Sequence, residues 1–524
     1  MGTTRDRVLA AFSLLFGLGM LAYALVAYRD FIADDAYITL RYARHWLACL
    51  GPVWNPGERV EGYTSFLMLA LVTALGSLGL DLFVAARLVN FLSLAALVFY
   101  LSAFLRSRVR RDGAGEVAAA VSLMLVVGSF PLAIWAWGAM EGPLFAFLCT
   151  AGLGTTLTLL ERPAGSRRAL AAGVTLALVV LTRPDGALFL GFAGIALASR
   201  IPAQGRLAAR QLGIVALTSA ALLLPHLAWR LAYYGAWLPN SVVAKTTGLP
   251  DGLPEQGLSY VVAFLTMPPF VGLLGLGGFV LALRKAPRDR GLYLLLASTV
   301  VYSALVARVG GDYLPAARFL TPLLPLFGLL VFRGLEVVLR AASWRSSVAA
   351  VVAGAGLLAL QPYYFAKQEV IDPAQVVGTI IGRHIADKWA PGTGVALHTA
   401  GSTPYFAPDY VYIDMLGLND VHIARRQVAE FRSRWQRLPG HTKGDGRYVI
   451  ERDPDIIIAG PAEGTTVDRP WFLSDFEMAH LPGFHERYRL RVDRIDLRQL
   501  AARRRVGPWR PELMTFTYYE RVPR

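Results

Sequence analysis

Two adjacent carboxylates, Asp34 and Asp35, follow the first long apolar segment of the chain. Charge is costly inside a bilayer, so an acidic pair at a membrane edge indicates a functional site. A carboxylate there can accept the proton of an acceptor hydroxyl as a glycosidic bond forms. Neighbouring helical side chains point about 100° apart, so only one of the two is expected to be the base. Asp34 is the first choice, and Asp35 would orient it, cap the helix or help to hold a cation. A helix N-cap is also the simpler alternative for the Asp that directly precedes Ala36 and Tyr37.

Basic side chains in other segments between apolar runs suit a phosphate leaving group. Guanidinium and ammonium groups both bind phosphate oxygens. Arg183, Lys245 and Arg318 are predicted to contact a donor phosphate, with Arg41, in the run that the acidic pair opens, as the fourth. A salt-bridged turn is the simpler interpretation of Arg183.

A divalent cation is the only cofactor that the residue types suggest. Asp35 and Asp312 could supply oxygen ligands to Mg²⁺ or Ca²⁺. The eight His residues show no metal-ligand spacing, and the two cysteines, Cys49 and Cys149, do not imply a disulfide framework.

The composition is that of an integral membrane protein. Of the 524 residues, 55% are hydrophobic and only 17% are charged, and the mean hydropathy is +0.45. Residues 7–28 are long enough to span a bilayer, and no small-residue cleavage site precedes the acidic pair, which argues against a cleaved signal peptide. The net charge of +15 comes from clusters between apolar runs, which indicates cytoplasmic loops and not nucleic-acid binding.

About eleven spanning helices fit these runs, with the N-terminus inside. A further apolar run, 64–79, is expected to lie along the outer membrane surface. The expected spans are 7–28, 83–105, 115–134, 142–160, 168–182, 185–199, 209–230, 259–283, 291–308, 318–335 and 346–364.

The chain after about residue 365 has the mixed charge of a soluble domain. We therefore predict a transmembrane domain over 1–365, with a first outer loop over 29–82, and an extracytoplasmic α/β cap over 366–524. Asp372 and Pro373 indicate the start of a helix that runs to about Trp389. Short strands are expected at Val395–Leu397, Val411–Ile413, Ile456–Ile458, Arg487–Ile495 and Met514–Tyr519.

Three function classes suit apolar spans with an outer polar face: a lipid-linked transferase, a transporter and a structural membrane protein. The sequence holds no Gly-x-x-x-x-Gly-Lys-Ser/Thr phosphate loop, which argues against ATP-driven pumping. No cytoplasmic domain is expected that could bind a nucleotide sugar, so a donor would have to arrive attached to lipid. A lipid-linked-sugar transporter stays the alternative outside enzymes.

The order of several segments from about residue 30 to 460 resembles the bacterial GT-C arabinofuranosyltransferases, and within them the mycobacterial terminal β-1,2-arabinofuranosyltransferases. The similar segments are 34–44, 54–64, Gly138–Leu144, Thr182–Gly186, Leu238–Lys245, Gly310–Tyr313, Ala317–Phe319, Ile413–Asp420 and Gly440–Gly446.

This resemblance implies a GT-C membrane fold, a donor such as decaprenyl-phosphate arabinofuranose, and inversion at the anomeric carbon. It implies that Asp34 and Asp35 are catalytic. It places the other motif residues in a sugar or acceptor cavity, namely Asn55, Glu61, Tyr63, Glu141, Asp185, Asn240 and Asp312. Glu141 could also be a solvated turn residue.

The expected protein is thus an inverting glycosyltransferase of the bacterial inner membrane, with its active site on the periplasmic side. Its partners would be membrane lipid, a polyprenyl-phosphate-linked sugar donor and a glycan or glycoprotein acceptor. Transfer of another lipid-linked sugar, such as mannose, is the alternative within enzymes.

Overall fold

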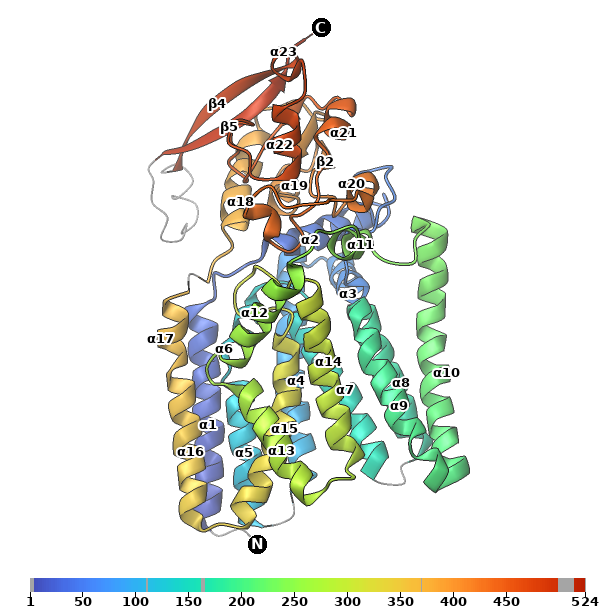
Figure 1. The fold of residues 1–524 in the computed structure, drawn as a ribbon, viewed down its shortest axis with the longest axis vertical. Coiled ribbons are helices and arrows are strands. Elements are labelled where there is room, and N and C mark those ends of the chain that lie inside the picture. The colour runs from blue at the N-terminus through green and yellow to red at the C-terminus, as the bar shows by residue number, and fades with distance from the viewer. Residues whose placement is uncertain (1–3, 110–111, 162–164, 369, 498–512, 524) are drawn as a thin grey trace.

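The computed structural model describes residues 4–109, 112–161, 165–368, 370–497 and 513–523. A helical bundle carries a smaller α/β domain at one end, and the N-terminus lies at the other end (Figure 1). The bundle contains α1 (Thr4–Ala27), α4 (Leu82–Arg106), α5 (Gly113–Val127), α6 (Phe130–Trp137), α7 (Gly142–Glu161), α8 (Ser166–Thr182), η1 (Pro184–Gly186), α9 (Ala187–Ala198), α10 (Ile201–Tyr234), α12 (Leu253–Leu265), α13 (Val271–Lys285), α14 (Arg290–Arg308), η2 (Thr321–Leu323), α15 (Leu324–Arg340), α16 (Trp344–Ala359) and α17 (Gln361–Ala366).

Among the described residues, seven helices are long and apolar enough to cross a membrane alone. The pair α5 and α6, bent by 42°, would be an eighth. The predicted count of eleven is therefore not reached by length alone, because the runs 168–182 and 185–199 fall on α8, of 17 residues, and α9, of 12.

The predicted span over 259–283 is wrong as a single helix. It is divided into α12 and α13 by residues 266–270, which include Pro268 and Pro269. Proline has no N–H to donate and its ring obstructs the preceding turn, so the helix ends before this pair.

Three short helices lie between the bundle and the α/β domain (Figure 1). They are α2 (Asp34–Leu47), α3 (Phe66–Ser77) and α11 (Asn240–Thr246). The apolar helix α3 packs against α2 and α4 and lies at the end of the bundle that carries the α/β domain. The helix expected within residues 64–79 is thus found at that end of the bundle, and its position along the outer membrane surface stays a prediction.

The C-terminal α/β domain, called the cap below, contains a five-stranded sheet in the order β2-β1-β3-β5-β4. The strand β1 is parallel to β2 and β3, whereas β5 is antiparallel to β3 and β4. Its elements are α18 (Pro373–Ala386), β1 (Gly394–Leu397), α19 (Ser402–Phe406), β2 (Val411–Asp414), α20 (Val421–Arg425), η3 (Trp435–Arg437), α21 (Gly446–Glu451), β3 (Ile456–Ile457), α22 (Leu473–Ala479), α23 (Phe484–Arg487), β4 (Tyr488–Asp496) and β5 (Leu513–Arg521). The five predicted strands are confirmed within a residue or two. The predicted helix start is confirmed as well, because the Asp372 carboxylate accepts the Ala374 N–H at 3.1 Å.

Candidate active site

The two carboxylates of the acidic pair face different partners. Asp34 accepts hydrogen bonds from the N–H groups of Gly401 and Ser402 at 3.1 and 2.8 Å, and from the Ser402 hydroxyl at 2.5 Å. Its own N–H donates to the Asp372 carboxylate at 2.7 Å. The alternative in which an Asp of the pair is the N-cap of its own helix is wrong, because α2 already begins at Asp34 and its N-cap is Ala33. The Asp34 carboxylate instead binds the first N–H groups of α19. The first loop and the cap therefore lie on the same side of the membrane domain, as predicted.

Asp35 belongs to a buried charged cluster with Arg318 and Asp312. Arg318 donates from Nη1 to Asp35 at 3.0 Å, and its Nε lies 2.6 Å from the nearer Asp312 oxygen. The Arg318 side chain is only 5% exposed. Its guanidinium thus occupies the position between the two carboxylates that were predicted to hold a cation. Within the described ranges, no set of three or more His, Cys, Asp or Glu side chains is arranged for a metal ion, so the donor set does not fit the predicted Mg²⁺ or Ca²⁺.

Lys245 brings a second cation to this cluster from α11. Burial lowers the pKa of Lys245, although the charges of Asp35 and Asp312 act in the opposite direction. Among the described residues no hydrogen bond or ion pair is formed by its ammonium group. The N–H donors of Lys245 are therefore not used by any side chain that the structure describes, and they can bind a further anion.

A second group of ions adjoins the first through a phenylalanine ring. Arg183 contacts Glu141 at 2.8 Å and Asp185 at 2.9 Å. The guanidinium carbons of Arg183 and Arg318 lie 4.7 and 4.6 Å from the centroid of the Phe319 ring. Because Arg183 is already matched by two carboxylates, its charge is less available to a phosphate than that of Lys245. The salt-bridged turn that the sequence left open for Arg183 and Asp185 is confirmed.

Arg41 does not lie at this cluster, and its predicted contact with the donor phosphate is corrected by the structure. Its fully buried guanidinium donates to the carbonyl oxygens of Trp54 at 2.7 Å and Pro404 at 2.6 Å, and to that of Tyr410 at 3.5 Å. It also lies over the Trp54 and Tyr412 rings. Arg41 thus joins α2 and the first loop to the cap.

Two predicted cavity residues, Asn55 and Asn240, also connect the membrane domain to the cap. Asn55 donates to and accepts from the backbone of Tyr412, at 2.7 and 3.2 Å. Asn240 donates to the carbonyl oxygens of Gly417, Leu418 and Asp420 at 2.9 to 3.1 Å. Their amide groups are therefore engaged with the protein backbone and are not directed at a sugar.

Two further predicted cavity residues, Glu61 and Tyr63, contact the end of α10. Glu61 forms an ion pair with Arg230 at 2.8 Å, and the hydroxyls of Tyr63 and Tyr234 are 3.2 Å apart. Burial raises the pKa of Glu61 to about 7, and the charge of Arg230 opposes that rise. Of the predicted site residues, the structure thus brings together Asp35, Glu141, Arg183, Asp185, Lys245, Asp312 and Arg318.

Sequence reasoning missed two residues beside Asp35. The charge of Asp35 acts on the half-buried His441 of the cap, whose pKa is lowered to about 4 by desolvation. The imidazole of His441 meets the Tyr313 ring edge to face, with 4.9 Å between centroids. The signal was present, because both residues stand in segments that the resemblance singled out, but no role was assigned to either.

The contact between Asp34 of α2 and Asp372 of the cap is expected to contribute less stability as the pH rises. Burial raises the pKa of Asp34 to about 6, against the hydrogen bonds from Ser402, and burial with repulsion from Asp34 raises that of Asp372 to about 7. A raised folded-state pKa contributes stability that is complete below the unfolded value, near 4, and is lost as the pH rises through 6 to 7. The temperature at the midpoint of thermal unfolding should therefore decrease as the pH is raised from about 5 to about 8.

Asp372→Asn should reduce this dependence on pH in a thermal-shift assay of the purified protein. Asp387→Asn, at the exposed opposite end of α18, is the matched control and should retain it. Equal pH dependence in the two variants would contradict the assignment.

Comparison with known proteins agrees with this architecture. Residues 363–507 match a family described as a domain of unknown function, DUF8728. The terminal beta-(1->2)-arabinofuranosyltransferase of Corynebacterium glutamicum is 26% identical over 439 residues, which cover 74% of this chain and 59% of that protein. The chain thus spans about three fifths of the length of that relative.

Two solved structures have similar folds. ArnT from Cupriavidus metallidurans bound to undecaprenyl phosphate matches with a TM-score of 0.53 and 13% identity, over 77% of this chain and 86% of that one. The Archaeoglobus fulgidus oligosaccharyltransferase in complex with Zn and sulfate matches with a TM-score of 0.52 and 13% identity, over 92% and 71% of the chains. This chain therefore has the GT-C membrane fold, and its sequence is similar to that of an arabinofuranosyltransferase.

Proposed function

We propose that this chain is a membrane glycosyltransferase that moves a sugar from a polyprenyl phosphate to an acceptor beneath the cap. The observation that carries the proposal is the cluster in which the Asp35 carboxylate lies beside Arg318 and Lys245, whose ammonium group has no partner within the described ranges. A base and a phosphate-binding cation are the two groups that this transfer needs, and here they share one site at the boundary between the bundle and the cap.

The proposed reaction is a single displacement. The acceptor hydroxyl oxygen forms a bond to the anomeric carbon while the bond from that carbon to the phosphate oxygen breaks. The phosphate leaves with the electron pair, next to Lys245, and the hydroxyl proton passes to Asp35. Attack from the face opposite the leaving group inverts the anomeric configuration.

Asp35 suits the role of base better than Asp34, the first choice from sequence. Three hydrogen bonds from the cap occupy the Asp34 carboxylate, whereas Asp35 is bound through one oxygen to Arg318. Burial raises the pKa of Asp35, but the charges of Lys245 and Arg318 outweigh burial and hold the pKa below its ordinary value. Asp35 is therefore ionised at neutral pH. A donor phosphate beside Lys245 would offset part of that positive charge and make Asp35 a stronger base.

The donor sugar in this proposal is arabinofuranose, carried by a polyprenyl phosphate. Similarity to the Corynebacterium glutamicum arabinofuranosyltransferase supports the sugar, and the undecaprenyl phosphate bound to the ArnT structure supports the lipid carrier. The acceptor is a glycan or a glycoprotein.

We place the chain in the bacterial inner membrane with the cap outside. The connections at the end of the bundle remote from the cap carry basic residues. These residues contact neighbouring helices and connections at the same end. Arg340 lies 3.0 Å from Asp112, Arg333 lies 2.5 Å from Asp289, and Arg5 lies over the ring of Trp344. Such a basic end indicates the cytoplasmic face.

The proposal is tested by incubating the purified protein, in lipid nanodiscs, with synthetic prenyl-phosphoryl arabinofuranose and an oligosaccharide acceptor. Transfer of arabinose to the acceptor with inversion supports it. Transfer only from a prenyl-phosphoryl mannose would overturn the sugar assignment. Movement of intact donor across a vesicle membrane without cleavage would favour a transporter instead.

Lys245→Met is expected to weaken donor binding and to shift the pH profile. Loss of the free cation should raise the KM for the donor about tenfold or more, because a charge-assisted hydrogen bond is worth 1.5 kcal/mol or more. Removing a charge that lowers the pKa of Asp35 should also move the acid limb of kcat/KM to higher pH, since activity is lost as pH falls through that pKa. Lys245→Arg keeps the charge and should keep the limb in place. An unchanged donor KM in Lys245→Met would contradict the phosphate assignment.

A further inference from the structure

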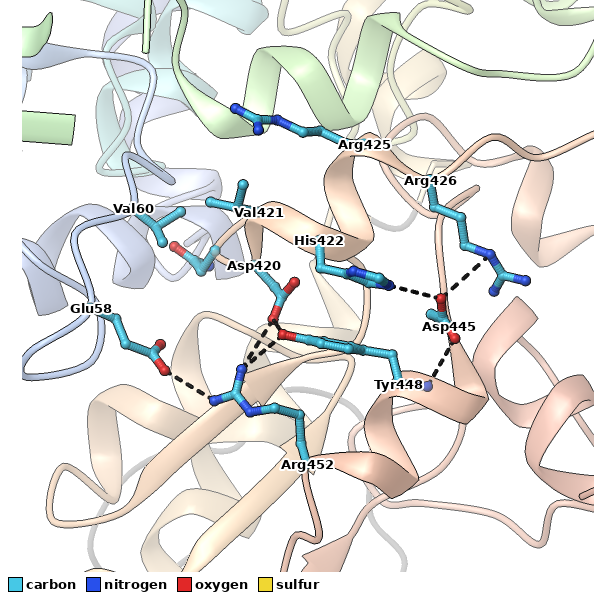
Figure 2. A pocket seen from close by; sticks show the side chains of 11 residues that line it. Glu58, Val60, Asp420, Val421, His422, Arg425, Arg426, Asp445, Tyr448 and Arg452 are labelled. Carbon is cyan, nitrogen blue, oxygen red and sulfur yellow. Dashed lines mark hydrogen bonds and ion pairs between the residues drawn. The ribbon is translucent and has the colours of Figure 1, made fainter. Parts of the chain in front are cut away.

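A cavity of about 730 Å³ opens where the first loop meets the cap. Figure 2 shows Glu58 and Val60 of the first loop on one side, facing Asp420, His422 and Arg452 of the cap. Its volume is within the range of small-molecule sites. The cavity has walls from segments nearly 400 positions apart in sequence, so it exists only in the assembled protein.

Some hydrogen-bonding groups that line this cavity already have protein partners, and others remain exposed to solvent. Arg452 donates to Glu58 at 3.0 Å and to the Tyr448 hydroxyl at 2.9 Å, and that hydroxyl donates to Asp420 at 3.1 Å. The Glu58 and Arg452 side chains stay 39% and 35% exposed. Each carboxylate has further lone pairs and the guanidinium further N–H groups. Donors and acceptors therefore alternate along the wall, an arrangement that matches sugar hydroxyls, which both donate and accept.

The charges around this cavity are close to balanced. Three carboxylates, Glu58, Asp420 and Asp445, and three arginines, Arg425, Arg426 and Arg452, line it. A phosphate or a nucleic acid would meet the carboxylates, and an apolar lipid chain would leave them without solvent. A neutral, hydroxyl-rich ligand is the class that this balance fits.

A flat ring pair forms part of the same wall. The His422 imidazole is stacked on the Tyr448 ring with 4.1 Å between centroids and 14° between planes. Tyr448 covers one face of His422, and the His422 side chain is 53% exposed. An aromatic face carries partial negative charge, so it attracts the weakly positive C–H groups on one side of a sugar ring.

The cavity is tied to the Asp35 cluster through α11. The backbone of Asp420, which lines the cavity, accepts from Asn240 at the start of α11, and Lys245 is in the last turn of that helix. The seven residues of α11 span roughly 10 Å. One end of α11 thus binds a residue that lines the cavity, and the other end contributes Lys245 to the cluster, so we expect a few linked sugar residues to bridge the two sites.

We propose that this cavity binds neutral sugar residues of the acceptor glycan, behind the residue that receives the transferred sugar; this rests on the proposed function. It also supplies acceptor contacts that Asn55 and Asn240, engaged with the cap backbone, do not. The cavity would make the protein favour an extended acceptor over a short one.

The test compares short and long acceptors in the variants Arg452→Ala and His422→Ala. Arg447→Ala is the matched control, since Arg447 is exposed on α21, the helix that Arg452 directly follows, and does not line the cavity. We expect the KM for a linear arabinofuranose tetrasaccharide to rise about tenfold in both variants. The values for the monosaccharide acceptor and for the donor should stay unchanged. An unchanged tetrasaccharide KM, or an equal loss on both acceptors, overturns the inference while leaving the transferase activity in place.

A binding experiment without donor separates this inference from the proposed function. Arabinofuranose and mannose tetrasaccharides are titrated into the full chain in nanodiscs and followed by saturation-transfer NMR, with a polygalacturonate tetramer as the anionic comparison. Binding of a neutral tetrasaccharide that is lost in Arg452→Ala supports the cavity even where no transfer is found. Binding of the anionic tetramer alone, or of none of the three, overturns it.

Discussion

Asp35→Asn is expected to lower the kcat of sugar transfer by about 10²- to 10⁴-fold, the range that general-base catalysis supplies. Asn has nearly the same shape and keeps an oxygen for the N–H groups of Arg318, so the cluster should stay assembled. What it loses is the ability to accept the acceptor proton. Transfer measured in a single turnover at saturating donor, with the donor KM determined in parallel, isolates this effect.

The control for that variant is its neighbour, Asp34→Asn. The Asp34 carboxylate is bound to Gly401 and Ser402 at the start of α19 and not to the charged cluster, so its loss should change the pH dependence of thermal stability more than kcat. A large loss of kcat in Asp34→Asn with near wild-type turnover in Asp35→Asn would return the role of base to Asp34.

Arg41→Met is expected to have the largest effect on stability. The guanidinium of Arg41 is fully buried and donates to carbonyl oxygens of the first loop and of the cap. Each carbonyl left without a donor costs about 1–3 kcal/mol, so the two shorter bonds together predict a loss of roughly 2–6 kcal/mol. The unfolding midpoint of the cap, followed by limited proteolysis across a temperature series, should fall clearly.

Arg59→Met is the comparison for Arg41→Met. Arg59 belongs to the same loop but is exposed, and it only lies over the Tyr233 ring at 4.7 Å. Its replacement should leave the proteolysis midpoint near that of the wild type. Equal midpoints in both variants would show that Arg41 does not hold the cap in place.

The sequence identified the charged residues of the cluster because their chemistry is visible in their types. Asp35, Lys245, Asp312 and Arg318 all stand in polar segments between apolar runs, and a membrane protein brings such segments together at one surface. The strands of the cap were likewise found from short β-branched runs such as Val411–Ile413, since apolar strands bounded by turn residues have a strong local pattern.

The different roles of Asp34 and Asp35 could not be predicted in this way. It depends on Gly401 and Ser402, some 368 positions from Asp34, and no local pattern encodes that contact. Arg41 was misassigned for the same reason. An arginine next to a candidate site suggests phosphate binding, but the carbonyl groups that engage it come from Pro404 and Tyr410 in the cap.

The joint between α2 and α19 also has a consequence for the biosynthesis of the chain. The cap groups that Asp34 and Arg41 contact lie 363 to 369 positions later in the chain. With the cap outside the membrane, as proposed, these groups would have to be translocated before they can meet the first loop. During synthesis, Asp34 and Arg41 therefore lack these cap partners until most of the polypeptide has been made. A nascent chain arrested before residue 400 would carry Arg183, Lys245 and Arg318 and still lack Gly401, Ser402 and Pro404, which bind Asp34 and Arg41 of α2. Catalytic competence should therefore arise only after these residues have been made.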